Sequence, residues 1–261
     1  MNWAAYVENG KPFDDVYIFD VHGHIGGDIR LQLGNHTADD MVNTLDRLGV
    51  NSICVSPILA FASDWVRGNE LALDAVKKHP GRIYAYATPN PFYEDCDLSR
   101  YLVPGNGILG IKAHGEYQAG TPLCDRRFDP AYEIADQKRL PVLFHAWTAR
   151  QVAEGMDVAS RFPNANFIFA HVGFTEADAK AGVIAGAKKY DNVYIDTAIS
   201  SSYDGTIEYL VNRVGDEKVL YGSDCSFFDC CHTLGKLALS RLSDTQKEKI
   251  LGQNAKKLFA I

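Results

Sequence analysis

Eight short runs of apolar and β-forming residues recur along this chain, and stretches with helical periodicity separate them. The runs cover residues 16–22, 52–57, 82–89, 107–114, 140–146, 166–171, 192–198 and 218–224. Residues 142–144 and 167–170 are continuously apolar, which is typical of strands buried on both faces under a layer of helices. The alternation therefore predicts an α/β fold built on a parallel sheet.

The stretches between the runs carry helix start and stop signals. Thr37 stands as an N-cap ahead of acidic residues, and Gly49 stands where that helix would end. Ser243 and Gln246 have the spacing of a capping box. We expect helices over residues 37–49, 69–81, 129–139, 149–163, 176–190, 205–215 and 243–260.

Eight strand–helix units in 261 residues predict a (β/α)8 TIM barrel. No linker, low-complexity tract or change of composition marks a second domain, so we expect a single domain over residues 1–261. A doubly wound open sheet is the alternative. It is less favoured because no glycine-rich phosphate loop follows the first run.

Charge and composition restrict the partners of the chain. With 26 Lys and Arg against 33 Asp and Glu, the net charge is −7, and an acidic chain is a poor nucleic-acid binder by default. No apolar run is long enough to predict a membrane span, and the first residues lack the pattern of a secretory signal. The six cysteines form no C-x-x-C pair and are interpreted as thiols, mostly buried, in a reducing cytoplasm. We expect a small-molecule substrate, and a homo-oligomer is among the assemblies left open.

In a barrel of this kind, functional side chains come from the C-terminal ends of the strands. Five of the eight histidines stand at the ends of the predicted strands, and an aspartate ends the last one: His22, His24, His114, His145, His171 and Asp224. His22 and His24 are two residues apart, so both side chains would point to the same side of a strand and could chelate one ion. Imidazole nitrogens with one carboxylate suit zinc, manganese or iron.

Each of these residues also has a purely structural explanation. His145 could be a core histidine bonded to a backbone carbonyl, Asp224 could cap the following helix, and Lys112 could extend to solvent at the barrel rim. If there were no metal site, all these structural explanations would have to hold at once, in the same layer of the barrel. Because that coincidence is improbable, we favour a metal site. Cys225 is not expected among the ligands, because neighbouring residues at a strand end point in opposite directions.

Six segments together resemble the amidohydrolase superfamily: residues 19–24 (FDVHGH), 110–114 (GIKAH), 143–145 (LFH), 169–171 (FAH), 222–224 (GSD) and 250–255 (ILGQNA). More narrowly, the chain is similar to the amidohydrolase-related branch (amidohydrolase 2), which also contains non-oxidative decarboxylases. The resemblance covers essentially the whole chain and is specific for the superfamily rather than for a substrate. It implies a distorted barrel that binds one or two divalent metal ions.

The resemblance also implies roles for individual residues. The ligands of a single zinc-like ion, with manganese and iron as alternatives, would be His22, His24, His145 and Asp224. His171 would bind the substrate or polarise its carbonyl group. In the binuclear alternative, His171 would bind a second ion, and a carboxylated Lys112 would bridge the two. We favour one ion, because residues 111–114 and the short chain resemble the mononuclear members.

Four residues near the predicted barrel mouth are candidates for substrate binding: Lys112, His114, Trp147 and Arg150. His114 shares a strand face with Lys112, and Arg150 could hold a substrate carboxylate through two hydrogen bonds. Arg150 could equally be a solvated helix residue. Aromatic residues of the predicted loops would either enclose a small planar or apolar substrate or pack helices against the barrel: Phe61, Trp65, Phe92, Tyr117, Trp147 and Phe227.

These residues predict a metal-dependent hydrolase that cleaves a carboxylic ester, lactone or amide bond of a small molecule. The metal would lower the pKa of a bound water, and Asp224 would accept the proton of that water as the hydroxide attacks. The metal and His171 would stabilise the resulting oxyanion. Two alternatives stay open: a non-oxidative decarboxylase acting on a small aromatic or unsaturated carboxylic acid, and a non-catalytic metal-binding barrel.

Overall fold

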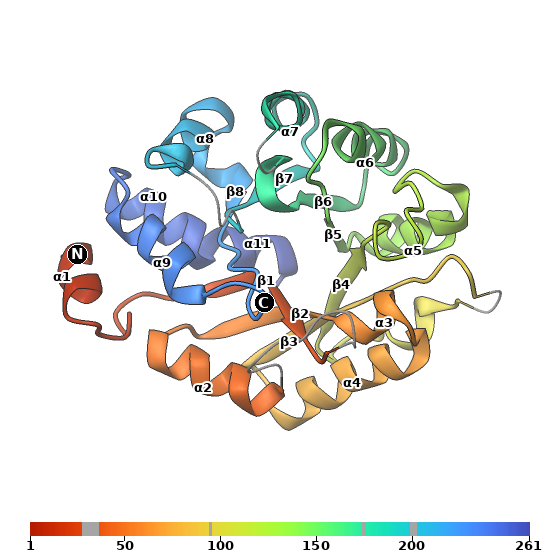
Figure 1. Ribbon diagram of the computed structural model, residues 1–261, viewed down its shortest axis with the longest axis horizontal. Coiled ribbons are helices and arrows are strands. Elements are labelled where there is room, and N and C mark those ends of the chain that lie inside the picture. Colours follow the sequence, from red (N-terminus) through yellow and green to blue (C-terminus); the bar gives the residue numbers. More distant parts are fainter. Residues whose placement is uncertain (28–36, 94–95, 174–175, 199–202) are drawn as a thin grey trace.

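The computed structural model describes residues 1–27, 37–93, 96–173, 176–198 and 203–261. Eight parallel strands form one sheet, in which each strand pairs with the next one along the chain. The strands are β1 (Phe19–Ile25), β2 (Ser52–Pro57), β3 (Ile83–Ala87), β4 (Ile108–Ala113), β5 (Pro141–Phe144), β6 (Asn166–Phe169), β7 (Val193–Asp196) and β8 (Val219–Leu220). They lie at the centre of the molecule with helices outside them (Figure 1).

The sheet closes because β1 contacts the segment that follows β8. The Asp224 N–H donates to the carbonyl of His22 over 2.8 Å, and Gly23 forms a parallel bridge with Cys225. An open doubly wound sheet has two unpaired edge strands, so these contacts exclude that alternative. The predicted (β/α)8 barrel is confirmed, and one domain over residues 1–261 remains our interpretation of it.

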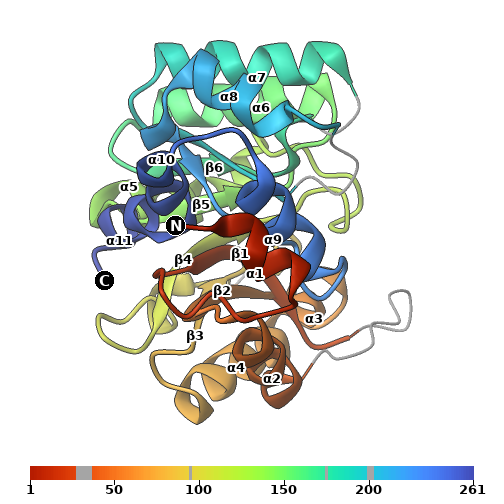
Figure 2. The ribbon, with the colours of Figure 1, turned by 90° about the vertical axis from the view of Figure 1, so that its left-hand side faces the viewer.

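Helices of different length surround the strands (Figures 1 and 2). The α-helices are α1 (Trp3–Glu8), α2 (Ala38–Leu48), α3 (Ile58–Ala62), α4 (Trp65–Lys78), α5 (Asp129–Lys138), α6 (Ala149–Arg161), α7 (Ala177–Lys189), α8 (Thr206–Val214), α9 (Cys230–Leu239), α10 (Asp244–Glu248) and α11 (Asn254–Phe259). Shorter 3₁₀ segments are η1 (Leu98–Arg100), η2 (Arg126–Phe128), η3 (Ala170–Gly173) and η4 (Asp216–Lys218), and η5 (Lys249–Gln253) is π-helical.

The helix signals of the sequence are largely confirmed. Thr37 caps α2, and Ser243 forms a capping box with Gln246 at the start of α10. The helix expected over residues 243–260 is confirmed over residues 244–259, and it contains a π-helical turn, η5, between α10 and α11. Helix α9 was not predicted, although its N-cap Asp229 accepts a hydrogen bond from a backbone N–H of the first turn.

Two apolar layers hold the fold together. The larger layer lies between the strands and the outer helices. The smaller layer fills the barrel at the end where the strands begin, and its buried members are Phe19, Val21, Cys54, Tyr86, Leu143, Ile168, Ala170, Leu220, Ala255 and Phe259. Because Ala255 and Phe259 belong to α11, this helix covers that end of the barrel.

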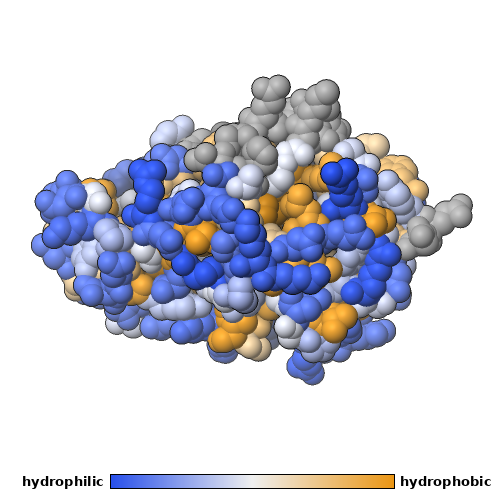
Figure 3. Space-filling model, turned by 90° about the horizontal axis from the view of Figure 1, so that it is seen from below, coloured by the Kyte–Doolittle hydropathy of each residue, from blue (hydrophilic) through white to orange (hydrophobic). Residues whose placement is uncertain are grey.

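The outer surface carries the polar faces of the helices. In the view of Figure 3, hydrophilic side chains cover most of the face, and hydrophobic side chains are visible in several separate patches between them. This is the pattern that amphipathic helices produce when their apolar stripes face the core. Within the described part of the chain, no helix is both long and apolar enough to cross a membrane.

Candidate metal centre

The first two predicted ligands come from the C-terminal half of β1. The register of β1 with β2 shifts between Asp20 and Gly23, which is the behaviour of a β-bulge, a feature that often re-aims side chains beside active sites. His22 and His24 are buried, and their Nε2 atoms lie 3.2 Å apart. The two imidazoles therefore point at one place in the barrel mouth, as their spacing predicts.

Asp224 brings a carboxylate to the same place. Its Oδ1 lies 3.0 Å from Nε2 of His24 and 3.4 Å from Nε2 of His22. Its backbone has a φ of 62°, a left-handed conformation that non-glycine residues adopt mainly where the surroundings enforce it, as at functional sites. Helix α9 is capped by Asp229, so the capping explanation for Asp224 is wrong.

Asp196, at the end of β7, orients His22. Its Oδ2 lies 2.7 Å from Nδ1 of His22, and its Oδ1 accepts hydrogen bonds from the backbone N–H groups of His171 and Ala198. When Asp196 is ionised it can only accept, so the proton of His22 then sits on Nδ1 and the lone pair of Nε2 faces the site. Burial raises the pKa of Asp196 to about 7.

Asp20 ties the two ligand-bearing segments together. Its Oδ1 accepts hydrogen bonds from the backbone N–H groups of His22 and Ser223, at 2.9 and 3.0 Å. Burial raises the pKa of this carboxyl to about 7. Sequence reasoning missed Asp20 and Asp196, although both are carboxylates within predicted strands. An acidic residue in an otherwise apolar run was the signal that could have found them.

His171 lies in η3, just after β6, and its ring is 5.1 Å from the ring of His22. It has a φ of 64°, and its Nδ1 donates to the carbonyl of Ala198 over 2.7 Å. Nδ1 also lies 3.9 Å from Oδ2 of Asp224. Among the described residues, His22, His171 and Asp224 form a group whose ligand atoms lie within 4.8 Å of one another. His171 is therefore close enough to serve as a ligand or to contact a substrate.

His145, the fourth predicted ligand, lies beside this group. Its Nδ1 is 3.3 Å from Nε2 of His171, and its Nε2 is 3.4 Å from Oε2 of Glu116. Sequence reasoning did not single out Glu116. The structure thus brings His22, His24 and Asp224 together and places His145 next to His171.

Lys112 lies at the base of the site rather than at the rim. The residue is fully buried, and its Nζ is 3.2 Å from Nε2 of His22. The alternative explanation, that Lys112 extends to solvent at the barrel rim, is wrong. Burial lowers the pKa of this amine to about 8, while Asp224 and Asp196 act in the opposite direction. The site therefore places an amine directly beside Nε2 of His22.

The donor atoms present fit a divalent cation. Burial lowers the pKa of His22 and His24 well below the ordinary value, so both imidazoles are neutral and can act as ligands. Ligand atoms about 2.1 Å from a tetrahedral cation stand roughly 3.4 Å from one another. The atoms of His22, His24 and Asp224 lie 3.0 to 3.4 Å apart.

A cavity of about 190 Å³ opens above these atoms. Its lining residues are His24, His114, Glu116, Tyr117, His145, Trp147, His171, Asp224, Phe227 and Phe228. All but two of them carry an aromatic or imidazole ring. The rings of His114 and His145 stack at 3.9 Å, and that of Phe227 meets His24 edge-on at 4.6 Å. The cavity is therefore a small, ring-walled space that ends at the candidate metal ligands.

Three of the predicted substrate-binding residues lie at this site, and Arg150 lies outside the cavity. His114 and Trp147 line it, whereas Arg150 lines a neighbouring cavity and pairs with Glu154 at 2.7 Å. Among the predicted loop aromatics, Tyr117 and Phe227 line the cavity, and Phe61 stacks on His114 from behind at 4.9 Å.

Two further aromatic predictions lie elsewhere. Trp65 is buried and donates a hydrogen bond from Nε1 to the carbonyl of Thr88, and Phe92 is exposed. Neither lines the cavity beside the metal ligands.

Comparison with known proteins identifies a family and several solved structures that this chain resembles. A family model described as amidohydrolase matches residues 56–261, which is most of the chain. No curated protein is matched. The chain resembles the solved structure of 5-carboxyvanillate decarboxylase from Novosphingobium aromaticivorans with bound manganese, at a TM-score of 0.73 and 15% identity over 96% of this chain and 99% of that chain.

Two other solved structures show the same likeness. For 2,6-dihydroxybenzoate decarboxylase from Rhizobium, the TM-score is 0.72 at 15% identity, over 94% of this chain and 99% of that chain. For 4-oxalomesaconate hydratase from Rhodopseudomonas palustris, the TM-score is 0.66 at 16% identity, over 93% of this chain and 95% of that chain. At identities this low, the likeness establishes a shared fold.

Proposed function

We propose that this chain, which belongs to the amidohydrolase family, is a metal-dependent enzyme that acts on small carboxylic compounds. The reaction that suits the site best is the non-oxidative decarboxylation of a small aromatic or unsaturated carboxylic acid. The observation that carries this proposal is the ring-walled cavity that ends at His22, His24 and Asp224. The three solved structures named above, two decarboxylases and a hydratase, support a reaction other than hydrolysis.

The metal would be held by His22, His24 and Asp224, with His145 and His171 beside them. A divalent cation bound there supplies a Lewis acid for carboxylate or hydroxyl oxygens of the substrate. Manganese and zinc both accept this donor set, and manganese occurs in one of the similar structures. A single ion is our proposal, since the ligand atoms of His22, His24 and Asp224 lie around one point.

The cavity wall selects the substrate by size and shape. Typical ligand pockets measure about 300–1,000 Å³, so a space of about 190 Å³ admits only a small molecule. Aromatic and imidazole rings line it on several sides, and rings of this kind pack well against a flat, conjugated molecule. These two features favour a small planar acid over a flexible ester or amide.

Asp224 and His171 are placed to handle a proton. Oδ1 of Asp224 faces the imidazoles of His22 and His24, whereas Oδ2 faces Nδ1 of His171. When the bond to the carboxyl carbon breaks, its electron pair stays on the ring or vinyl carbon, and that carbon must receive a proton. Asp224 can deliver this proton through Oδ2 and regain one from water, so that carbon dioxide and the protonated product leave.

Hydrolysis of an ester, lactone or amide is the second candidate. The observation that favours it is the cationic Lys112 at the base of the site, because a buried amine next to His22 would stabilise a developing oxyanion. In that reaction Asp224 would accept a proton from water instead of delivering one to carbon.

A product analysis distinguishes the two reactions. Purified protein loaded with manganese or zinc is incubated with a panel of hydroxybenzoic and unsaturated acids, and with a panel of esters, lactones and amides. We expect release of carbon dioxide from members of the first panel. Hydrolysis products from the second panel without carbon dioxide release from the first would replace the proposal by the second candidate. Tight metal binding with turnover of neither panel would favour a non-catalytic barrel.

A further inference from the structure

The loop between Asp224 and α9 contains a cysteine pair that the proposed reaction does not use. Cys225 follows Asp224 directly, and Cys230 is the first residue of α9. Their side chains form a disulfide, with Cα atoms 5.6 Å apart, a separation in the usual range for such bonds. The expectation that all six cysteines carry thiols is therefore wrong for these two. The thiols of the described residues belong to Cys54, Cys96, Cys124 and Cys231.

The disulfide encloses part of the cavity wall. Phe227 and Phe228 lie between the two cysteines and line the cavity, and the ring of Phe227 packs 4.6 Å from the ring of His24. The first cysteine is anchored to the barrel, since the carbonyl of Cys225 accepts a hydrogen bond from the His24 N–H. The position of this wall therefore depends on how firmly the loop is held at its two ends.

The bond spans too little of the chain to act mainly on the fold. It joins residues that are five apart in sequence. The stabilisation that a disulfide gives to a whole protein grows with the length of chain it encloses, and a short loop yields the least. Its main effect is consequently local, on the segment that carries Phe227 and Phe228 beside the metal ligand Asp224.

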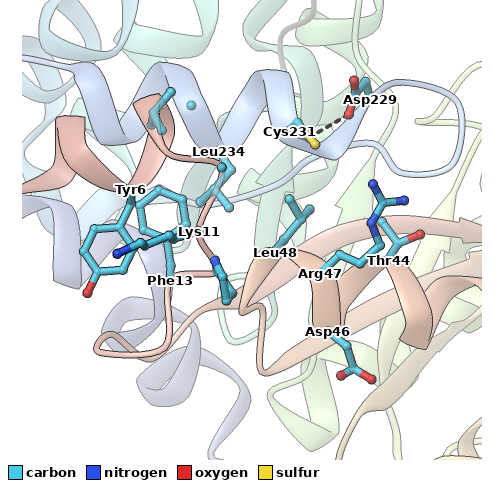
Figure 4. A pocket seen from close by; sticks show the side chains of 14 residues that line it. Tyr6, Lys11, Phe13, Thr44, Asp46, Arg47, Leu48, Asp229, Cys231 and Leu234 are labelled. Atoms are coloured by element: carbon cyan, nitrogen blue, oxygen red, sulfur yellow. Dashed lines mark hydrogen bonds between the residues drawn. The ribbon is translucent and has the colours of Figure 1, made fainter.

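A third cysteine, Cys231, lies beside this loop at the protein surface. Cys231 is exposed and lines a cavity of about 740 Å³ between α1, the end of α2 and the start of α9. Figure 4 shows its sulfur directed toward Asp229 at the edge of this cavity. Cys225 and Cys230 are themselves buried. The cavity therefore reaches Asp229 and Cys231, the residues on either side of Cys230.

We propose that Cys225 and Cys230 form a thiol–disulfide switch that fastens the wall made by Phe227 and Phe228. A small disulfide oxidises the pair: the two thiols lose two electrons and two protons, the Sγ–Sγ bond forms, and the reagent becomes two thiols. A dithiol reverses the exchange and leaves as a cyclic disulfide. With the disulfide formed, the wall made by Phe227 and Phe228 binds a planar substrate more tightly than it does when the disulfide is reduced. This last effect rests on the proposed function, whereas the exchange itself does not.

The first experiment counts thiols. Holoprotein treated with oxidised glutathione or with dithiothreitol is denatured, alkylated and weighed intact. We expect four labels after oxidation and six after reduction, because the chain has six cysteines and one disulfide. The variant Cys230→Ser should take five labels after either treatment. The matched control Cys231→Ser should keep the difference of two labels. Six labels on the oxidised wild type would overturn the proposal.

The second experiment measures the wall and the substrate separately. Reduction, or Cys230→Ser, should speed amide hydrogen exchange in residues 225–229 while bound metal and melting temperature stay the same. KM for the decarboxylation substrate should rise by about fivefold with little change in kcat, because the released wall weakens binding of the substrate without moving the metal ligands. Cys231→Ser should change neither quantity. Equal exchange in the oxidised and reduced protein would overturn the switch. A difference in exchange without turnover in any form would refute the proposed function and leave the switch standing.

Discussion

The two ends of the barrel interior are built from different kinds of side chain. Where the strands begin, Phe19 packs against Phe259 of α11 with ring centroids 5.5 Å apart, in a layer that is almost entirely apolar. Where the strands end, His22, Lys112 and Asp224 are equally buried but polar. Burying apolar surface stabilises the fold, whereas burying charge costs free energy that only specific partners offset. The first end therefore carries stability, and the second is where we propose that the chemistry takes place.

The largest test of this division is His22→Ala. The variant should lose its bound metal and at least about 10³-fold in kcat/KM, because a catalytic cation contributes several kcal/mol. The barrel should still fold, with a melting temperature within a few degrees of the wild type, since the apolar layers are untouched. Metal analysis and thermal unfolding of the same preparation check both statements. The control His79→Ala removes a surface histidine that pairs with Asp39 and should change neither.

The second test is Asp224→Asn, which keeps the size and one oxygen of the side chain. We expect the variant to retain much of its metal and to lose about 10²–10⁴-fold in kcat, because the amide can neither deliver nor accept the proton. Bound metal and turnover are measured on one preparation. If metal and activity fall in parallel, Asp224 only holds the ion. A fully active variant would remove it from the mechanism.

The third test moves to the apolar end. Phe259→Ala removes a ring that packs on Phe19 and Tyr86, and should lower the free energy of unfolding by about 3–5 kcal/mol. Metal content per folded molecule should stay at the wild-type value. Urea denaturation combined with metal analysis tests the separation of the two ends. Loss of metal from the folded variant would show that the apolar end also positions the ligands.

The fourth test concerns support of the ligands. Asp196→Asn removes the negative charge that faces Nδ1 of His22 and should weaken metal affinity by about 10–100-fold, as for other carboxylates behind a ligating histidine. A competition titration with a chelator measures the affinity. The matched variant Asp191→Asn changes an aspartate outside the site, five residues earlier in the chain, and should bind metal normally. Equal affinities in the two variants would contradict the orienting role.

The smallest effect is expected for Arg150→Ala. The side chain of Arg150 is 71% exposed and pairs with Glu154, in a cavity next to the ring-walled one. We therefore expect a change in KM of less than about threefold, in line with the small effects of exposed ion pairs. Trp147→Ala, which alters the wall itself, should raise KM more. A larger effect at Arg150 would show that the substrate extends into the second cavity.

Local patterns were enough to predict much of this molecule. Alternating runs and helix signals predict the barrel, because the residues within each short segment determine whether that segment forms a strand or a helix. The two-residue spacing of His22 and His24 predicts their convergence for the same reason. Asp224 could be chosen because it follows the last strand, and in a closed barrel that strand returns to the first.

Features that depend on the radius and register of the closed barrel could not be predicted. The contacts of Lys112 with His22 and of His145 with Glu116 join segments whose spacing only the closed barrel defines. The support of His22 by Asp196 spans 174 residues, so no local pattern records it. Helix α9 was missed because Gly235 and its cysteines weaken the helical signal.

The closure of β1 against the segment after β8 also bears on how the chain reaches its native state. The hydrogen bond from Ser223 to Asp20 joins residues 203 positions apart, and the candidate ligands His22 and Asp224 flank this contact. Contacts between such distant positions form late, because the chain must first be ordered in between. A folding intermediate that lacks the last strand would lack Asp224 beside His22 and His24. Tight metal binding would then require a closed barrel. The rate of metal uptake would therefore measure the rate of the final folding step.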